Sequence, residues 1–320
     1  MVADGEIGRH PDVIGIGLCT VDLLFAVPRP PTFGGLMRAS AYLRQGGGPV
    51  ATALVALARL GVATRFVGRV GDDDDGDFIR GEFEREGVDS SRIQMETGTV
   101  SRIALVLVDQ ATGERGFTAR PENCRPLTAG DLDREEIAAA RVLHLDDADE
   151  PSMQAARWTR EDGICVVFDG TWNHEDLDAF LPLVDVPIVS EPFVEAWMPG
   201  ASSREVVDRL WGYGPRIAVY TLGEKGCVAR WEEGTFAFPC FPIDVVDTTG
   251  AGDAFHGGFI YGLLQEWSVE RIVRFASAVA ALNCRQLGGR TGLPDRGEVD
   301  EFLRSAPHFG KEPLAEPNGS

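Results

Sequence analysis

Short apolar runs alternate with longer segments of helical periodicity along most of this chain. The runs have the length and β-branched content of buried strands, and they cover residues 13–19, 65–71, 142–146, 164–170, 186–190 and 216–223. Helical segments lie between them, at residues 49–60, 74–86, 153–160 and 205–211. This order predicts an α/β fold with a central, mostly parallel sheet and helices on both faces.

Two segments interrupt the alternation. Residues 23–45 contain the stretch PRPPTFGG, which is too rich in proline and glycine to be helical. Residues 101–120 contain IALVLVD, a TGE turn and RGFTAR, which predicts a β-hairpin. We expect the two segments to pair into a small β-sheet that covers a ligand crevice as a lid. The predicted domain spans residues 13–309, between a tail at residues 1–12 and a disordered tail at 310–320.

The composition argues against several classes of protein. Of the 320 residues, 30 are basic and 50 are acidic, and the formal charge of −20 does not suit a surface for nucleic acid or anionic membrane. No apolar run approaches the ~20 residues of a membrane span, and the first residues lack the apolar core of a signal peptide. The six cysteines form no CxxC pair, so we expect buried free thiols in a cytoplasmic protein.

Residues 245–264, VVDTTGAGDAFHGGFIYGLL, contain the clearest chemical signal. Gly250, Ala251 and Gly252 precede an apolar segment of helical spacing, so their amides and the helix dipole predict an anion site. Asp253 lies in the first helical turn, where we expect it to stay ionised. A carboxylate beside an anion site suits the removal of a proton from an alcohol as a phosphoryl group arrives. The simpler alternative is that Asp253 only stabilises the start of a buried helix.

Three segments together resemble one known family. DTTGAGDAFHGGF resembles the C-terminal signature of the ribokinase-like (PfkB) carbohydrate kinases. GGGPVATALVALARLGVATRFVGRVGDDDDGDFIRGEFEREGVD resembles their N-terminal signature, and TLGEKG, at residues 221–226, resembles their nucleotide-loop motif. The resemblance covers residues 13–305. It implies a ribokinase-like α/β fold and an ATP-dependent carbohydrate kinase that transfers the γ-phosphoryl group to a sugar hydroxyl, with Mg²⁺ and, in many members, K⁺.

The resemblance also implies roles for individual residues. Asp253 is the expected catalytic base, and the amides of Gly250, Ala251 and Gly252 are the expected anion hole. The remaining expected roles are substrate binding by Asp22, Gly47, Gly48 and Thr52, ATP binding by Thr221, Gly223, Gly226 and Asn283, monovalent-cation binding by Asp247 and Thr249, and magnesium binding by Glu191.

Two positions depart from the family pattern. Thr52 stands where the family often has asparagine, which alters one expected hydrogen bond to the substrate. The segment SEPF, at residues 190–193, lacks the last acid of the family's Asn-x-x-Glu motif, so the magnesium role passes to Glu191 or Glu195.

Different features of the sequence favour different classes of substrate. The motifs GGGPVATA, RFASAVAALNC and GGRTGLPD are most similar to the bacterial 6-deoxy-6-sulfofructose kinases. The acidic run at residues 146–150 favours a neutral polyol, whereas Arg38, Arg102, Arg115 and Arg120 in the expected lid favour a phosphate or sulfonate. We expect a neutral or unspecified small sugar. The alternatives are a sulfofructose or sugar-phosphate kinase, a nucleoside kinase of the same fold, and a sugar-binding protein without catalysis; a homodimer suits a family whose lid sheets often associate.

Three further features favour structural explanations or leave the choice open. The four aspartates at residues 72–75 favour capping of the next helix over a metal site, because consecutive positions do not converge. His256 follows the Asp253 turn, and a core histidine is favoured over a proton relay. His144 ends a strand at the expected crevice, where substrate contact and strand packing are equally weighted.

Overall fold

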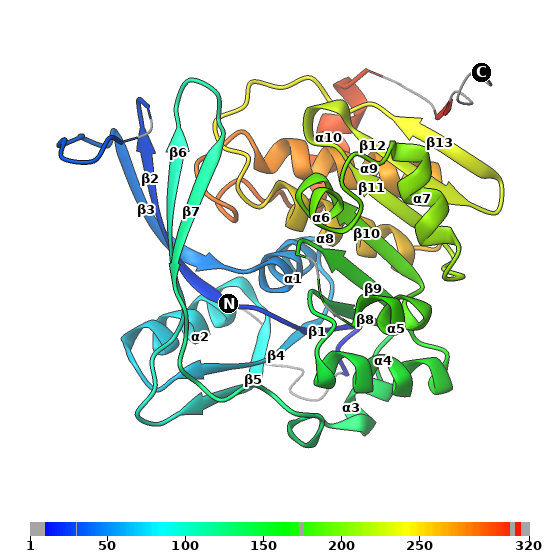
Figure 1. The fold of residues 1–320 in the computed structure, drawn as a ribbon, viewed down its shortest axis with the longest axis horizontal. Helices are drawn as coiled ribbons and strands as arrows, with labels where there is room; N and C mark the ends of the chain where they lie inside the picture. The colour runs from blue at the N-terminus through cyan, green and yellow to red at the C-terminus, as the bar shows by residue number, and fades with distance from the viewer. Residues whose placement is uncertain (1–9, 30, 173, 175, 308–310, 315–320) are drawn as a thin grey trace.

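The computed structural model describes residues 10–29, 31–172, 174, 176–307 and 311–314. These residues form a ten-stranded sheet in the order β14-β13-β12-β11-β10-β9-β8-β1-β4-β5 and a separate four-stranded sheet in the order β3-β2-β6-β7 (Figure 1). The strands of the main sheet are β1 (Val13–Ile16), β4 (Thr64–Gly71), β5 (Asp89–Glu96), β8 (Val142–Leu145), β9 (Cys165–Gly170), β10 (Val186–Ser190), β11 (Ala218–Thr221), β12 (Cys227–Trp231), β13 (Gly234–Phe238) and β14 (Glu312–Pro313).

The main sheet is parallel from β5 through β11 and antiparallel from β11 through β14. The mostly parallel sheet predicted from the sequence is therefore confirmed. Its helices are α1 (Pro49–Arg59), α2 (Asp74–Glu86), α3 (Arg134–Ala138), α4 (Glu150–Asp162), α5 (Leu177–Phe180), α6 (Glu191–Trp197), α7 (Ser203–Trp211), α8 (Ala251–Leu264), α9 (Val269–Asn283) and α10 (Arg296–Ser305).

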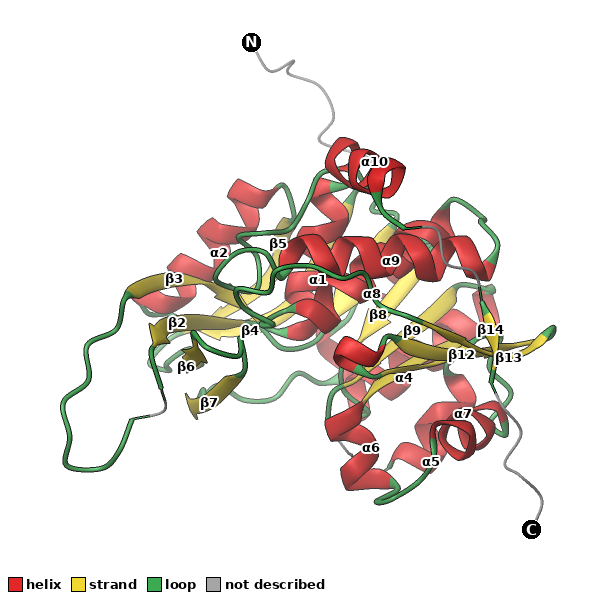
Figure 2. Ribbon diagram, turned by 90° about the horizontal axis from the view of Figure 1, so that it is seen from above, coloured by secondary structure: helices red, strands yellow, loops and turns green. Residues whose placement is uncertain are grey.

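Helices cover both faces of the main sheet, as the pattern predicted. Figure 2 shows α1, α8 and α9 on one face and α4 to α7 on the other. Successive residues of β1 point to opposite sides: Val13 joins the apolar core beneath α1 and α8, and Ile14 joins the core of the opposite face. Both side chains are buried, so the strand is apolar on both faces.

Helix α8 is buried along almost its whole length between α1 and α9. Glycines allow this close approach: a Cβ at Gly257 would lie 2.7 Å from the Ala56 Cβ on α1, and a Cβ at Gly258 would lie 2.8 Å from the Ala276 Cα on α9. The start of α8 is consequently held in place by the core of the protein.

The two interrupting segments pair as predicted. The small sheet consists of β2 (Thr20–Val27), β3 (Ala41–Gly47), β6 (Ile103–Asp109) and β7 (Arg115–Arg120); β6 and β7 form the predicted hairpin, and β6 runs parallel to β2. One face of this sheet buries a small apolar cluster that contacts Leu287, in the loop after α9. Exposed apolar side chains lie on this sheet and its connecting loop at Phe33, Leu36, Tyr42 and Phe117. The homodimer stays a prediction.

The ends of the predicted domain differ in detail from the sequence analysis. The Asp12 backbone N–H donates to the Ala63 carbonyl oxygen at 2.9 Å, so the residue before β1 already belongs to the fold. Glu312 pairs with Ala237 of β13, so this part of the tail expected to be disordered adds a strand to the sheet. Most of residues 1–12 and 310–320 lie outside the described residues.

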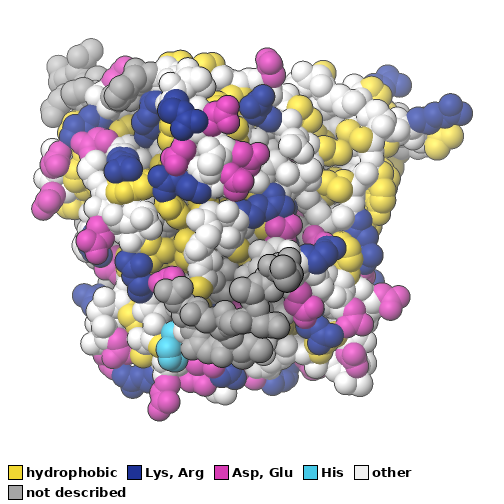
Figure 3. Space-filling view, turned by 180° about the vertical axis from the view of Figure 1, so that it is seen from behind, with side chains coloured by type: hydrophobic (Ala, Val, Ile, Leu, Met, Phe, Trp, Pro, Cys, Tyr) yellow, Lys and Arg dark blue, Asp and Glu magenta, His cyan; other side chains and the backbone are white. Residues whose placement is uncertain are grey.

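Surface and cysteine chemistry agree with the composition. Figure 3 shows acidic and basic side chains interspersed over the face opposite to that of Figure 1. All six cysteines have free thiols; Cys19, Cys227 and Cys284 are buried, and the others are partly exposed. In the described part of the chain, no helix combines the length and the apolar character that crossing a membrane requires.

The run of four aspartates at residues 72–75 caps helix α2, as the sequence predicted. The Asp73 carboxylate accepts the Gly76 N–H at 2.8 Å.

Candidate active site

The carboxyl ends of β8, β9, β10 and β11 meet along one edge of the main sheet. Asp146 follows β8, Asp169 lies near the end of β9, Glu191 follows β10, and Thr221 ends β11. Ligands of parallel α/β sheets bind at this edge, beyond the strand ends. The first turn of α8 reaches the same edge, because Asp253 interacts electrostatically with Asp169.

The loop before α8 is shaped for a close ligand approach. Gly250 is in the left-handed region with φ of 72°, and a Cβ there would lie 2.7 Å from the Gly289 carbonyl oxygen, so only glycine fits. A Cβ at Gly252 would meet nothing within 4 Å, which leaves open space over its amide. The Ala251 N–H, however, donates to the Thr248 carbonyl oxygen at 3.2 Å, so this amide of the expected anion hole is already engaged.

Asp253 is half-buried beside these amides, and no hydrogen bond between described residues ends on its carboxylate. Burial raises the pKa of Asp253 well above its usual range, the negative charges of Asp169 and Asp22 raise it further, and Arg115 and Arg290 oppose the rise. The sequence analysis expected Asp253 to stay ionised, but no N–H group of the described residues donates to its carboxylate, and burial and two other carboxylates favour the protonated form. A raised pKa suits a general base.

The expected sugar residues lie where β2 meets the start of α1. Asp22 is 7% exposed and accepts a hydrogen bond from the Thr20 hydroxyl; burial raises its pKa, and Thr20 and Arg290 oppose the rise. Gly47 lies directly against this carboxylate, since a Cβ at Gly47 would be 2.1 Å from Asp22 Oδ2. Gly48 is the N-cap of α1. The structure thus brings Asp22, Gly47 and Gly48 together.

Arg290 joins these residues and was missed as a site residue. It is 3% exposed, its Nη2 donates to the Gly47 carbonyl oxygen at 3.1 Å, and its Nε donates to Thr52 Oγ1 at 3.2 Å. Burial lowers the pKa of Arg290 to about 10, and Asp22 and Asp253 are among the charges that oppose this. Thr52 therefore supports Arg290 within the protein. The glycines beside Arg290 in GGRTG were the available signal, but sequence analysis used this motif only for family likeness.

The predicted nucleotide loop follows β11. Thr221 is half-buried, and its hydroxyl donates to the Val189 carbonyl oxygen at 3.2 Å. Gly223 and Gly226 both have positive φ angles, 54° and 87°, which makes a tight turn at the sheet edge. Glu191 is exposed beside this turn and lies 3.4 Å from Lys225 Nζ. The structure brings Thr221, Gly223, Gly226 and Glu191 together, with Glu191 paired to a lysine.

Asp247 ties residues 247–252, the loop before α8 with the first two residues of that helix, to the loop after α9. Because the predicted base, Asp253, follows residues 247–252 directly, we call this segment the catalytic loop. It is completely buried; Oδ1 accepts the Thr249 N–H at 2.8 Å and the Thr249 hydroxyl at 2.7 Å, and Oδ2 accepts the Gly288 N–H at 2.8 Å. Asn283 is also completely buried, and its Nδ2 donates to the Thr249 carbonyl oxygen at 3.2 Å. Asn283 thus supports this loop, and its expected role in ATP binding stays a prediction.

Two buried histidines lie beneath the start of α8. His256 Nδ1 donates to the Gly252 carbonyl oxygen at 2.9 Å and lies 3.2 Å from Asp169 Oδ2. His144 is completely buried and stacks on His256 with ring centroids 5.5 Å apart, and burial lowers its pKa to about 3. The prediction of a core histidine at position 256 agrees with this packing, and His144 packs within the sheet.

The β6–β7 hairpin contacts the catalytic loop. The Gly113 carbonyl oxygen accepts the Thr248 N–H at 3.3 Å and the Thr248 hydroxyl at 3.0 Å, and Arg115 Nη1 donates to Thr248 Oγ1 at 2.8 Å. Two other arginines of the expected lid have acidic partners: Arg102 pairs with Glu122, and Arg120 lies 3.5 Å from Asp75.

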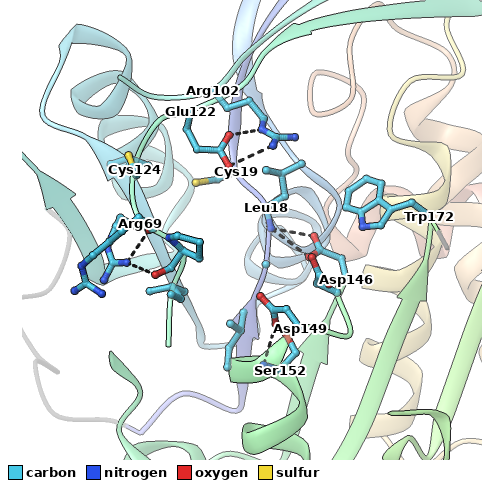
Figure 4. A pocket seen from close by; sticks show the side chains of 17 residues that line it. Leu18, Cys19, Arg69, Arg102, Glu122, Cys124, Asp146, Asp149, Ser152 and Trp172 are labelled. Carbon is cyan, nitrogen blue, oxygen red and sulfur yellow. Dashed lines mark hydrogen bonds and ion pairs between the residues drawn. The ribbon is translucent and has the colours of Figure 1, made fainter. Parts of the chain in front are cut away.

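A pocket of about 350 Å³ lies beside Asp146, next to the segments that connect the main sheet with the small sheet (Figure 4). Both Asp146 oxygens accept the Leu18 N–H, at 3.2 and 3.1 Å, and burial raises the pKa of this carboxyl group well above its usual range. The pocket is lined by other members of the acidic run, Asp147 and Asp149, together with Arg69, Arg102, Arg125 and Trp172. Asp22 and Asp253 are not among the residues that line it.

A family model described as pfkB family carbohydrate kinase matches residues 11–296. The chain belongs to the PfkB family of carbohydrate kinases. It is 30% identical over 329 residues to fructokinase-1 of Oryza sativa subsp. japonica, an alignment that covers 93% of this chain and 99% of the rice protein. As a PfkB sugar kinase, it is a phosphotransferase with a hydroxyl group as acceptor.

Solved structures share the fold of this PfkB kinase. The ribokinase of Thermotoga maritima superimposes with a TM-score of 0.81 at 24% identity, over 92% of this chain and 100% of that chain. Ribokinase of Arabidopsis thaliana, complexed with ribose and ATP, superimposes with a TM-score of 0.79 at 25% identity, over 92% and 99%. The ribokinase-like fold expected from the sequence is therefore confirmed.

Proposed function

We propose that this chain transfers the γ-phosphoryl group of ATP to a hydroxyl group of a small neutral sugar. Asp253 removes the proton of that hydroxyl, and the amides of Gly250 and Gly252 hold the phosphoryl oxygens. The observation that carries the proposal is the Asp253 carboxylate: it has no hydrogen-bond donor among the described residues, its pKa is raised, and it lies at a helix N-terminus whose loop is open to a ligand.

Asp22 and Gly47 orient the sugar toward Asp253. Their support comes from the contact between the Asp22 carboxylate and the Gly47 backbone and from the electrostatic interaction between Asp22 and Asp253. Arg290 holds the Gly47 carbonyl oxygen and Thr52 in place from within the protein. Such positioning supplies much of the rate enhancement of phosphoryl transfer, because little covalent chemistry is required of the protein.

ATP and Mg²⁺ fit the residues at the sheet edge. The turn at Gly223 and Gly226 offers backbone close to the phosphates, and Glu191 offers one exposed carboxylate beside it. Among the described residues, no group of three or more His, Cys, Asp or Glu side chains could hold a metal ion, which suits an ion bound mainly through phosphates and water. Bound Mg²⁺ neutralises charge on the phosphates.

The monovalent-cation role of Asp247 and Thr249 is a finer part of the proposal. Three hydrogen bonds already end on the Asp247 carboxylate, which offers about four acceptor positions in all. The Asn283 Oδ1 atom nearby is buried and accepts no hydrogen bond from a described residue. These oxygens are the ligand type that K⁺ requires.

Two of the four arginines expected in the lid, Arg102 and Arg120, have acidic partners, which favours a neutral sugar over an anionic one. Arg102 and Arg120, which could have bound a phosphate or sulfonate, are occupied by Glu122, Asp75 and the Ser101 carbonyl oxygen. Relatives named fructokinase and ribokinase act on neutral sugars by their names. The substrate panel below keeps the anionic sugars as an explicit alternative.

The test is ADP release from ATP with Mg²⁺ and K⁺, across neutral hexoses and pentoses, their phosphates, sulfofructose and nucleosides. We expect turnover with a neutral hexose or pentose and its loss in Asp253→Asn. Asp244→Asn is the matched control, because Asp244 is exposed in the preceding loop.

The alternatives give different results in the same assay. Turnover with adenosine or inosine but no sugar would select a nucleoside kinase. Turnover with sulfofructose or a sugar phosphate alone would contradict the neutral substrate. Tight sugar binding by calorimetry without ADP release would select a binding protein, and full activity of Asp253→Asn would remove Asp253 as the base.

A further inference from the structure

One arginine of the β6–β7 hairpin lies beside the predicted anion hole. Arg115 is the first residue of β7, and its Nη1 donates to the Thr248 hydroxyl at 2.8 Å. The Thr248 carbonyl oxygen accepts the Ala251 N–H at 3.2 Å. A single residue, Thr248, therefore connects the Arg115 guanidinium to the loop that forms the start of α8.

The hairpin holds Arg115 at this position through its backbone. The Gly113 N–H donates to the Asp109 carbonyl oxygen at 2.8 Å, and the Asp109 N–H donates to the Glu114 carbonyl oxygen at 2.8 Å, which closes the turn. The turn then rests on the catalytic loop, where the Gly113 carbonyl oxygen accepts both the N–H and the hydroxyl of Thr248. Arg115 is thus carried to the site by a defined turn.

Arg115 differs from neighbouring cations in its partner. Arg120, on the same strand, lies near Asp75, and Arg290 is buried and donates to Gly47 and Thr52. The hydrogen-bond partner of Arg115 is a neutral hydroxyl, its guanidinium carbon also lies 5.7 Å from the centroid of the Phe117 ring, and its side chain is exposed. Because a hydroxyl is a weaker partner than an anion, the guanidinium can exchange it for a phosphoryl oxygen.

The charge of Arg115 also acts at the reacting centre. It is one of the two arginines whose charge opposes the raised pKa of Asp253. Lysines do not supply this charge, since the sequence has only Lys225 and Lys311, and these lie 3.4 Å from Glu191 and 2.7 Å from Glu233. Phosphoryl transfer needs a positive group near the equatorial oxygens of the transferred phosphorus.

We propose that Arg115 donates hydrogen bonds to the transferring phosphoryl group and stabilises its charge in the transition state. This inference rests on the proposed kinase function. In that step the sugar oxygen forms a bond to the γ-phosphorus, the bond from the γ-phosphorus to the β–γ bridging oxygen breaks, the hydroxyl proton passes to Asp253, and ADP leaves. Arg115 is then a catalytic residue that the small sheet supplies when it lies on the catalytic loop.

Steady-state kinetics of four variants test this role. Arg115→Gln should lower kcat by about 10²-fold, the loss typical of one donor to a developing negative charge, with the KM for sugar nearly unchanged. Arg115→Lys should recover part of kcat, because it keeps the charge. Thr248→Val removes the hydroxyl partner of Arg115 and should lower kcat much less. Glu114→Gln, a charge change in the same turn, is the control and should keep wild-type kcat.

Chemical rescue separates a catalytic role from a structural one. Added guanidinium ion, below denaturing concentration, should restore part of kcat to Arg115→Ala and should leave the kcat of Glu114→Gln unchanged. Wild-type kcat in Arg115→Gln would overturn the inference. An equal loss in Thr248→Val and Arg115→Gln, without rescue, would overturn it in favour of a contact that only holds the hairpin. A wild-type protein inactive on every sugar would instead show failure of the proposed function.

Discussion

Asp247 and Asp253 stand at the two ends of one short loop, and their surroundings are opposite. Asp247 is completely buried and accepts three hydrogen bonds, from Thr249 and Gly288. Asp253 accepts none from the described residues, and burial together with nearby carboxylates raises its pKa. A carboxylate whose acceptors are filled holds structure, whereas one left without donors beside a ligand site is available to take a proton. The predictions below test this contrast.

The largest expected effect is on catalysis by Asp253→Asn. Its kcat/KM should fall by about 10²-fold to 10⁴-fold, because the substituted amide cannot accept the hydroxyl proton. ADP release measures this loss, and ATP binding by calorimetry should be retained. Weak ATP binding would mean that the substitution disturbs the loop rather than the proton transfer.

The same variant should gain stability at neutral pH. The folded-state pKa of Asp253 is raised above its unfolded-state value, so the native state binds more protons than the unfolded state between the two values. Stability therefore falls as pH rises through this window, and the neutral asparagine avoids that loss. Calorimetric Tm values should be higher for Asp253→Asn at pH 8 and equal to wild type below about pH 4. A lower Tm at pH 8 would contradict the assigned surroundings.

Asp247→Ala should behave in the opposite way and lose stability. It leaves the buried N–H groups of Thr249 and Gly288 without acceptors, which should lower the free energy of unfolding by about 3 kcal/mol. Urea unfolding followed by fluorescence measures this, with Asp244→Ala as the exposed control in the same loop. An unchanged midpoint would show that these hydrogen bonds do not hold the loop.

Smaller effects are expected on the pH dependence of kcat/KM. Turnover needs ionised Asp253, so activity is lost as pH falls through the Asp253 pKa. Asp169→Asn removes a charge that raises this pKa and should move the acid limb to lower pH; Arg290→Met removes an opposing charge and should move it to higher pH. Asp22 and Arg115 act on the same carboxylate and are kept unchanged in both variants.

The opposite shifts of the acid limb expected for Asp169→Asn and Arg290→Met test whether charge controls the Asp253 pKa. Arg290→Lys keeps the charge and should leave the acid limb near its wild-type position, which separates the charge of Arg290 from its hydrogen bonds to Gly47 and Thr52. If the acid limbs of Asp169→Asn and Arg290→Met moved in the same direction, a common structural change, not charge, would be responsible.

The smallest expected effect is the change in kcat/KM when the monovalent cation is exchanged. Replacing K⁺ with a large organic cation should lower kcat/KM by about fivefold, the lower range for coupled ligands. Rates at constant ionic strength measure this. Equal rates in both salts would leave Asp247 and Thr249 with the structural role alone.

Local patterns predicted the elements that bear the site. The range 74–86 for α2, the start of α1 at Pro49 and the β6–β7 hairpin all follow from proline, glycine and alternating apolar residues close together in sequence. Asp253 and the glycines before it were found for the same reason, because the anion site and its carboxylate belong to one short segment.

What sequence analysis missed depends on contacts between distant segments. Burial raises the pKa of Asp253, and Asp169 and Asp22, each on a different strand, raise it further; sequence order reveals neither the burial nor the convergence of these carboxylates. Arg290 reaches Gly47 from the loop after α9, a separation of 243 residues. The engagement of the Ala251 amide by Thr248 depends on the turn geometry, which a motif does not specify.

The contact between the hairpin and the catalytic loop bears on how substrate preference can change. Gly113 offers its backbone carbonyl oxygen to Thr248, and a main-chain acceptor is retained when the surrounding side chains are replaced. We expect the hairpin to tolerate replacement of its side chains. Residues that face the sugar can change while the hydrogen bonds from Thr248 to the Gly113 carbonyl oxygen are kept. Grafting the corresponding hairpin of a fructokinase or a ribokinase onto this chain, with Arg115 kept in place, is therefore a direct route to new acceptor selectivity without rebuilding the phosphoryl-transfer centre.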